Sequence, residues 1–236
     1  MKRTIMLILL LLVILCGIFL MGFKVSKSRS FQFFGGLVQK VDTEEKVIAL
    51  TFDDGPTKKT DEILELLNQL GVKATFFVTG RELEQHIEEG KKIVLAGHEL
   101  GNHTYSHKRM VLKSPAFISE EIKLTDQLIR DTGYQGDIQF RPPFGKKFVL
   151  LPYLLKNNNR NTIMWDIEPE SLAHIAADSE KIVNHVVENV KPGSIILLHV
   201  MYESRKETLN SIEGIVTALT AQGYIFKTVS ELLDYQ

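Results

Sequence analysis

Two adjacent carboxylates follow the first apolar run of the chain. Asp53 and Asp54 stand in the stretch TFDDGP at residues 51–56, directly after the β-prone residues 46–50. Because neighbouring side chains at the end of a strand point to different sides, the two carboxylates can do different work. One could bind a metal while the other handles a proton. A solvated Asp-Asp-Gly turn is the alternative interpretation.

A second polar stretch, GHELGNHTYSH at residues 97–107, contains three of the seven histidines. His103 and His107 are four residues apart, and on a helical turn this spacing puts both imidazoles on one face. Two such histidines with one carboxylate make a metal site that keeps positions open for water and substrate. A pair of surface or capping histidines is the alternative. The remaining histidines are expected to be structural (His98) or exposed (His86, His174 and His185).

Two further segments carry residues that can act with this group. In FRPPFG at residues 140–145, two prolines and a glycine make a rigid loop, and Arg141 can brace a carboxylate with two hydrogen bonds. A Pro-rich connector with a solvated arginine is the alternative. The apolar run SIILLH at residues 194–199 ends in His199. That histidine is either a satisfied core residue or a proton donor with a pKa near working pH.

The elements that must position these residues alternate along the chain. We expect strands at 47–52, 74–78, 138–140, 162–165, 194–199 and 224–228, and helices at 60–70, 81–96, 115–132, 147–157, 179–190 and 207–222. Ser114-Pro115 is a favourable helix start, and Gly71, Gly133 and Gly223 stand where helices should end. The alternation predicts a parallel α/β sheet, in a barrel or a doubly wound arrangement, with ligands at the carboxyl ends of the strands.

Composition limits the class of protein. The chain has 236 residues and a net charge of -1, and the part after the N-terminal segment is long enough for one α/β domain with a real core. The near-neutral charge argues against a nucleic-acid binder held by phosphate contacts. Cys16, the one cysteine, lies in the apolar N-terminal segment, so the folded part has no disulfide or thiolate chemistry.

The N-terminal segment has the length of a membrane span. Residues 5–23 carry no charge and would form a helix of ~28 Å, close to the hydrocarbon thickness of a bilayer. No A-x-A cleavage pattern follows, which favours an uncleaved single-pass anchor over a cleaved signal peptide and secretion. Basic residues lie on both sides of the run, so the positive-inside rule does not fix its orientation.

Four motifs together resemble the polysaccharide deacetylase family, also called the NodB-like domain or carbohydrate esterase family 4. TFDDGP matches the first family motif, HTYSH at 103–107 the second, RPPFG at 141–145 the third and LLH at 197–199 the fifth. The resemblance covers roughly residues 46–233. We therefore expect an anchor at 1–23, a linker at 24–45 and a polysaccharide deacetylase domain at 46–236.

The resemblance implies a distorted (β/α) barrel with fewer than eight strands and metal-dependent removal of N-acetyl groups from glucosamine-containing polymers. By this likeness Asp54, His103 and His107 bind a divalent metal, commonly zinc, although cobalt or another first-row ion also suits such ligands. Asp53 resembles the general base and His199 the general acid.

The resemblance also implies roles around this centre. Arg141 would orient Asp53, and the backbone N–H near Phe144 would help to hold the oxyanion. The residues expected to bind substrate are Pro143, Phe144, Gly145, Trp165 and Leu197.

The fourth family motif does not match. The family has an Asp-Trp pair there, whose Asp tunes the catalytic histidine, and in the stretch WDIEPESL at 165–172 the equivalent positions fall on Ser171-Leu172. Asp166, Glu168 or Glu170 could substitute, and the sequence leaves the choice open.

The function expected from these observations is that of a membrane-anchored, extracytoplasmic N-deacetylase of peptidoglycan or chitooligosaccharides. An O-acetyl esterase acting on a xylan-like polysaccharide is one alternative, because it would use the same metal site. A degenerate domain that binds cell-wall glycan without cleaving it is the other, motivated by the weak fourth motif.

Overall fold

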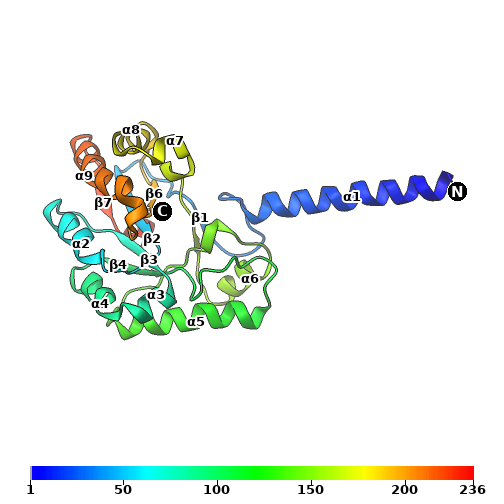
Figure 1. The fold of residues 1–236 in the computed structure, drawn as a ribbon, viewed down its shortest axis with the longest axis horizontal. Helices are drawn as coiled ribbons and strands as arrows, with labels where there is room; N and C mark the ends of the chain where they lie inside the picture. Colours follow the sequence, from blue (N-terminus) through cyan, green and yellow to red (C-terminus); the bar gives the residue numbers. More distant parts are fainter. Residues whose placement is uncertain (1) are drawn as a thin grey trace.

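A parallel sheet lies at the centre of the computed structural model, which describes residues 2–236 (Figure 1). Its strands are β1 (Leu37–Val38), β2 (Val47–Asp53), β3 (Thr75–Val78), β4 (Glu99–Asn102), β5 (Thr162–Ile163), β6 (Ile195–Leu198) and β7 (Ile225–Lys227). Five of them are joined in the order β4-β3-β2-β6, with β7 also paired to β2, and β1 pairs with β5. All of these pairings are parallel. The chain therefore has the predicted parallel-sheet α/β fold.

Single bridges connect the two groups of strands. Phe140 pairs with Asn102 at the end of β4 and with Thr162 of β5, and Ile167 pairs with Ile196 of β6. Pairing thus continues from β4 through Phe140 to β5 and returns to β6. Because these pairings are parallel, the segments that follow the strands leave from the same end of the sheet.

Helices surround the sheet. They are α1 (Lys2–Ser26), α2 (Thr60–Gln69), α3 (Gly80–Gln85), α4 (Ile87–Leu95), α5 (Pro115–Asp131), α6 (Leu150–Asn157), α7 (Ala173–Ala176), α8 (Ser179–Asn189), α9 (Lys206–Ala221) and α10 (Val229–Leu233), with short 3-10 turns η1 (Pro143–Gly145), η2 (Pro169–Ser171) and η3 (Glu203–Arg205). Local chemistry sets their ends. At the start of α5, Oγ of Ser114 accepts the N–H of Phe117 at 3.2 Å, and Gly133 follows the same helix with a φ of 90°.

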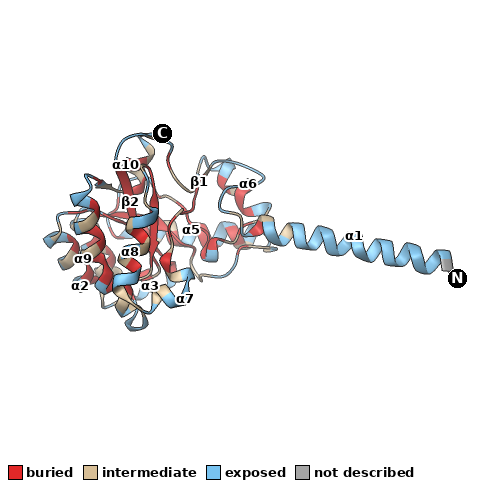
Figure 2. Cartoon of the chain, turned by 90° about the horizontal axis from the view of Figure 1, so that it is seen from above, coloured by how far each residue is buried: buried red, intermediate tan, exposed pale blue. Residues whose placement is uncertain are grey.

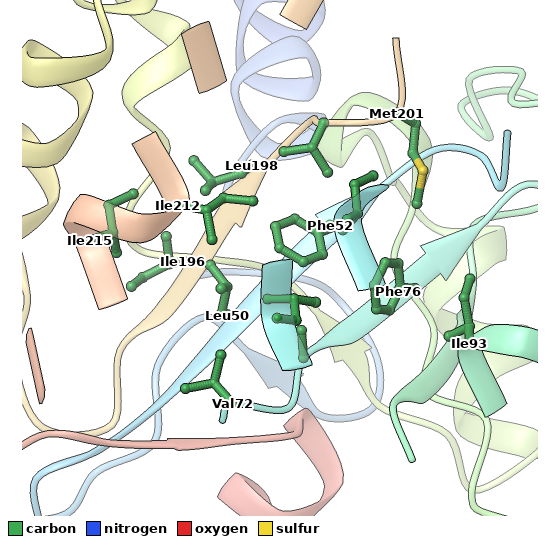
Figure 3. Packing of buried hydrophobic residues seen from close by; sticks show 14 of the residues in the cluster. Leu50, Phe52, Val72, Phe76, Ile93, Ile196, Leu198, Met201, Ile212 and Ile215 are labelled. Atoms are coloured by element: carbon green, nitrogen blue, oxygen red, sulfur yellow. The ribbon is translucent and has the colours of Figure 1, made fainter. Parts of the chain in front are cut away.

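The two faces of β2 have different neighbours, because alternate side chains of a strand point to opposite faces. Leu50 and Phe52 lie in the larger core cluster, between the sheet and the helices that cover it (Figure 3). Ala49 belongs to a second, smaller cluster. Thr51 and Asp53 share the face of Ala49, so the sheet's pleat directs Asp53 away from the larger core.

The apolar helix α1 projects from this body, and its residues 3–21 are exposed (Figures 1 and 2). By length and composition its segment Arg3–Ser26 could cross a membrane. The residues after it contribute to the folded body: β1 pairs with β5, and Val38 and Val41 are buried. Part of the segment expected to be a linker, 24–45, is therefore packed.

Several predicted boundaries are wrong for identifiable reasons. The sequence does not predict β4, because Glu99–Asn102 contains one large apolar residue and is held by its pairing with β3. The helix expected at 81–96 is interrupted at His86, whose φ is -130°. The strand expected at 138–140 reduces to the bridges of Phe140. The helix expected at 147–157 begins at Leu150, because the backbone of Lys146 is extended (φ -90°, ψ 116°) and both the N–H and the Nζ of Lys147 are bound at the end of α1 and just after it.

Candidate active site

A buried ion pair lies at the carboxyl end of β2. Nη1 of Arg141 donates to Oδ1 of Asp53 at 2.7 Å and to Oγ1 of Thr51 at 2.8 Å. Arg141 is 0% exposed and Asp53 is 2% exposed. Burial alone would raise the pKa of Asp53, but the charge of Arg141 is the largest of the opposing effects, which together hold the pKa below its ordinary value. Asp53 is therefore an ionised carboxylate in a fixed position.

His103 presents a free nitrogen to the two aspartates. Its Nδ1 lies 2.7 Å from the carbonyl oxygen of Arg141, and because a carbonyl can only accept, Nδ1 carries the proton. Nε2 keeps its lone pair and lies 3.5 Å from Oδ2 of Asp53. A histidine whose second nitrogen is held by a carbonyl is the usual form of an imidazole metal ligand.

Three ligand atoms converge beside this pair. Asp54, His103 and His107 each offer one atom within 4.8 Å of the others. Nε2 of His107 lies 3.5 Å from Oδ1 of Asp54, and the ring centroids of His103 and His107 are 5.0 Å apart. Burial and the neighbouring His103 lower the pKa of His107, which favours the neutral form that can bind a cation. The donor set therefore fits a divalent first-row metal.

The loop that carries the two histidines differs from the prediction of a helical turn. Thr104 and His107 have φ values of 67° and 54°, in the left-handed region. Side chains hold this loop instead: Oδ1 of Asn102 accepts the N–H of Thr104 at 2.8 Å, and Glu121 accepts the N–H of Ser106 at 2.8 Å. The four-residue spacing brings the imidazoles together, but not through helical geometry.

The turn that carries Asp54 is fixed by one carboxylate that the sequence analysis missed. Oε2 of Glu82 accepts the N–H of Gly55 at 2.8 Å and the hydroxyl of Thr79 at 2.7 Å, and Oε1 accepts the hydroxyl of Tyr202 at 2.6 Å. Asp54 itself has a φ of 76°, which is strained for a residue with a side chain. Glu82 therefore helps to maintain the direction in which Asp54 points. Its sequence context, an ordinary helical stretch, gives no signal of this.

Glu170 is the residue that faces His199. Its Oε2 accepts from Nδ1 of His199 at 2.7 Å and from the backbone N–H of His199 at 2.8 Å, and Oε1 accepts the hydroxyl of Thr208 at 2.9 Å. The other two candidates are engaged elsewhere. Asp166 accepts the N–H of Ile195 and the hydroxyl of Ser194, and Glu168 accepts the indole N–H of Trp165. The structure thus resolves the choice that the sequence leaves open.

This pairing sets the charge of His199. Burial alone would lower its pKa, but the hydrogen bond that it donates to Glu170 and the charge of Asp53 raise the pKa of His199 to about 9. Nδ1 is held by Glu170, so Nε2 is the nitrogen that can exchange a proton with a ligand. His199 is therefore a positioned cation at neutral pH.

The residues expected to bind substrate differ in their access to solvent. Phe144 is 52% exposed, and the centroid of its ring lies 4.6 Å from the ring centroid of His107. The others are buried: Pro143, Gly145, Trp165 and Leu197. The side chain of Phe144 is thus partly open to solvent beside His107, while the other four lie in the protein interior.

An open cleft of about 230 Å³ adjoins two of the three ligand residues, Asp54 and His107. The side chains that line it include Asp54, Arg81, Glu82, Tyr105, His107 and Tyr202. A polar cleft of this kind can receive a hydrated, hydroxyl-rich ligand next to the site.

Comparison with known proteins agrees with these observations. The family described as Polysaccharide deacetylase matches residues 40–163, just over half of the chain, and the match contains the first three motifs. This chain belongs to the polysaccharide deacetylase family. The parallel sheet, with the first, second and fifth motifs at the carboxyl ends of β2, β4 and β6, agrees with the fold expected from the resemblance.

The similarity to individual relatives extends over most of this chain. A peptidoglycan-N-acetylglucosamine deacetylase of Bacillus cereus is 35% identical over 203 residues, which cover 86% of this chain and 95% of the relative. The crystal structure of the Bc1960 peptidoglycan N-acetylglucosamine deacetylase aligns with a TM-score of 0.78 at 27% identity, over 84% and 92% of the two chains. BA3943 of Bacillus anthracis, described as a pseudoenzyme, aligns with a TM-score of 0.73 at 27% identity, over 84% and 71%.

Proposed function

We propose that this deacetylase is a metal-dependent hydrolase that removes N-acetyl groups from N-acetylglucosamine-type residues of peptidoglycan or chitooligosaccharides. The observation that carries the proposal is a proton acceptor and a proton donor placed beside one set of ligand atoms. Asp53 is ionised, His199 is protonated, and Asp54, His103 and His107 converge next to them. The names of the relatives support acetylated cell-wall sugars as the substrate class.

The three convergent side chains are proposed to hold the ion. Zinc is the first candidate, and cobalt or another first-row ion is the alternative, because two imidazoles and a carboxylate accept several such ions. When bound, the ion would polarise the acetyl carbonyl and lower the pKa of a nearby water.

The protein's own groups are proposed to handle the protons. Asp53 accepts a proton from the water that attacks the carbonyl carbon, and Arg141 keeps its carboxylate ionised and aimed. The backbone N–H of Phe144, whose φ is 57°, is proposed to stabilise the oxyanion. His199 then gives its proton to the sugar nitrogen as the C–N bond breaks, because an amide nitrogen leaves poorly as an anion. Acetate and a free amine are the products.

The experiment is acetate release by the metal-loaded protein from peptidoglycan, chitooligosaccharides and acetylxylan, measured side by side. A free amine as the second product supports N-deacetylation, and a free hydroxyl supports the O-acetyl esterase. Asp53→Asn is the matched control that removes the proposed base while keeping its shape. Glycan binding without acetate release from any substrate would favour a catalytically weak binding domain.

A membrane anchor at α1, with the catalytic domain outside the cytoplasm, completes the proposal. Its support is the length and apolarity of the exposed helix, together with relatives named for extracytoplasmic polymers. We also propose the division of the chain into an anchor, a linker and a catalytic domain, which the family match supports. A closed, barrel-like sheet is proposed from the single bridges that connect β4, β5 and β6. Full-length protein should fractionate with membranes, and protease added to intact spheroplasts should degrade the domain. A shortened species in the medium would instead identify α1 as a cleaved signal peptide.

A further inference from the structure

We propose that the folded body docks on the membrane surface through an apolar patch at the base of α1, and that anionic phospholipid is its partner. The α1-base patch consists of Phe31, Phe33, Leu112, Phe148, Val149 and Leu150. The proposal rests on the proposed anchoring by α1 and extends membrane contact from the helix to the body.

The patch is exposed and continuous. Leu112 is 87% exposed, and Phe31 and Phe33 are 49% and 47% exposed. The ring centroids of Phe31 and Phe33 are 5.5 Å apart, and those of Phe33 and Phe148 are 5.7 Å apart. Leu112 and Phe148 line one apolar hollow together with Val149 and Leu150. Contiguous exposed apolar surface of this kind marks a binding surface.

The helix itself gives the depth of the patch. Leu112 and Phe148 line a second hollow with residues 18, 19, 22 and 23 of α1, and a Cβ added at Gly22 would lie 3.5 Å from the ring of Phe148. These helix residues are the end of the uncharged run 5–23. At 1.5 Å per residue, residues 18–23 span the last ~8 Å of that run. Side chains at this level lie below the surface of any bilayer that the run crosses.

The charges around the patch select the kind of membrane. Its residues come from three segments, 24–34, 108–115 and 146–156, each of which contains three Lys or Arg and no Asp or Glu. The Nζ atoms of Lys27 and Lys146 lie 4.9 Å and 4.7 Å from the ring of Phe23, at the end of the uncharged run. Cations at this level match the phosphates of anionic headgroups. In a chain whose net charge is -1, this concentration of positive charge is local.

The body is also held close to the helix. The N–H of Lys147 donates to the carbonyl of Ser26 at 2.8 Å, and its Nζ donates to the carbonyl of Ser28. Figure 2 shows α6 close to the base of α1. These contacts orient the patch toward the side from which α1 enters the membrane.

The test uses the full chain in lipid nanodiscs that contain phosphatidylglycerol. In a Cys16→Ser background, Leu112→Cys carries an environment-sensitive fluorophore, and Asn210→Cys on α9 is the control. We expect the label at 112 to shift to the blue and to be quenched by spin labels on the lipid acyl chains, while the label at 210 is unaffected. Equal exposure of both labels to a soluble quencher would overturn the proposal.

Two further outcomes are diagnostic. Lys108→Glu with Lys113→Glu should reduce the lipid quenching at 112 at least twofold, and unchanged quenching would overturn the assignment to anionic lipid. In detergent, the label at 112 could instead be protected from the soluble quencher to an extent that increases with protein concentration. That result would identify a second copy of the chain as the partner and overturn docking on lipid. The readout needs no substrate, so loss of hydrolysis leaves it intact. A chain that leaves the discs would overturn both the anchor and the docking.

Discussion

Oε2 of Glu170 lies 2.7 Å from Nδ1 of His199 and also accepts the backbone N–H of the same histidine. The other oxygen of Glu170 accepts the hydroxyl of Thr208 and lies 3.5 Å from Nη1 of Arg205. The carboxylate is therefore held on both sides, and it fixes the tautomer, the orientation and the charge of the imidazole.

Replacing Glu170 with Gln should move the alkaline limb of the rate–pH profile to lower pH. The pKa of His199 is raised to about 9, so the protonated form is present below that value and is lost as pH rises through it. Without the carboxylate charge the pKa falls, and the acid is lost earlier. Both proteins should be compared at the same metal content, because a bound cation also lowers this pKa.

Glu168→Gln is the matched control, since Glu168 accepts from the indole of Trp165 and not from His199. Its alkaline limb should stay at the wild-type position. Identical profiles for the Glu170 and Glu168 variants would contradict the role of Glu170.

The two adjacent aspartates should respond differently to the same change. Asp54→Asn removes the one charged member of the proposed ligand set, so metal retention and activity should both fall, and excess metal should restore part of the rate. Asp53→Asn removes the base and also leaves the buried charge of Arg141 without its partner, so stability should fall, but the three ligand side chains are unchanged. In the folded protein the rate should therefore fall by ~10²–10⁴ while metal content stays near that of the wild type.

Elemental analysis of both purified variants, alongside acetate-release rates, distinguishes them. Loss of metal in Asp53→Asn with retention in Asp54→Asn would reverse the two assignments. Full activity in both variants would remove the basis of the proposed active site.

Arg141→Met should destabilise the protein strongly. It leaves the carboxylate of Asp53 buried without its partner, a change that typically costs about 3–5 kcal/mol. Adding Asp53→Asn removes the uncompensated charge and should recover part of the loss. Urea unfolding of the two single variants and the double variant gives the coupling directly, and purely additive losses would mean that the pair is not energetically linked.

The sequence predicts the catalytic end of the sheet well, because the motifs are short and local. The apolar residues of a buried run such as Val47–Asp53 are enough to predict a strand. Polar residues that follow such parallel strands must then lie at one edge of the sheet. The sequence predicts β4 poorly, because Glu99 and Gly101 carry no strand signal. Thr75 and Ser230 satisfy the buried Glu99 from distant parts of the chain.

The partner of His199 also cannot be predicted from local sequence. Three acidic residues lie within five positions of each other, and only the course of the chain through η2 decides that Glu170 reaches the histidine. Two of the supporting contacts of Glu82 are also distant in sequence, since Gly55 lies 27 and Tyr202 lies 120 residues away. Local pattern identifies the candidate site residues, whereas tertiary packing identifies those that hold them.

His98, which the sequence indicates to be structural, should make the fold sensitive to acid. Its Nδ1 accepts the N–H of Ala74 at 3.2 Å, and burial lowers its pKa to about 4. Because the folded pKa lies below the unfolded value, the stabilisation is complete above pH 6.5 and is lost as pH falls through 4. At pH 4.5 the loss should be roughly 2–3 kcal/mol.

His98→Asn is the comparison, because its Oδ1 can accept the same N–H but does not titrate. In metal-free protein, the wild type should lose more free energy of unfolding than this variant between pH 7 and pH 4.5. Parallel pH dependence of the two proteins would show that His98 does not contribute.

The attachment of Lys147 to Ser26 has a consequence for the glycan that the proposed enzyme could reach. Lys146 contacts Phe23 at the end of the uncharged run, and Phe144, two residues earlier, packs on His107. A catalytic domain on a flexible tether samples a range of heights above the membrane, and this range grows with the length of the tether. The short, packed connection seen here instead holds the domain at one height. With α1 in the bilayer, the reacting centre would work within a thin layer above the lipid. The length of the connection would then determine which layer of polymer is modified.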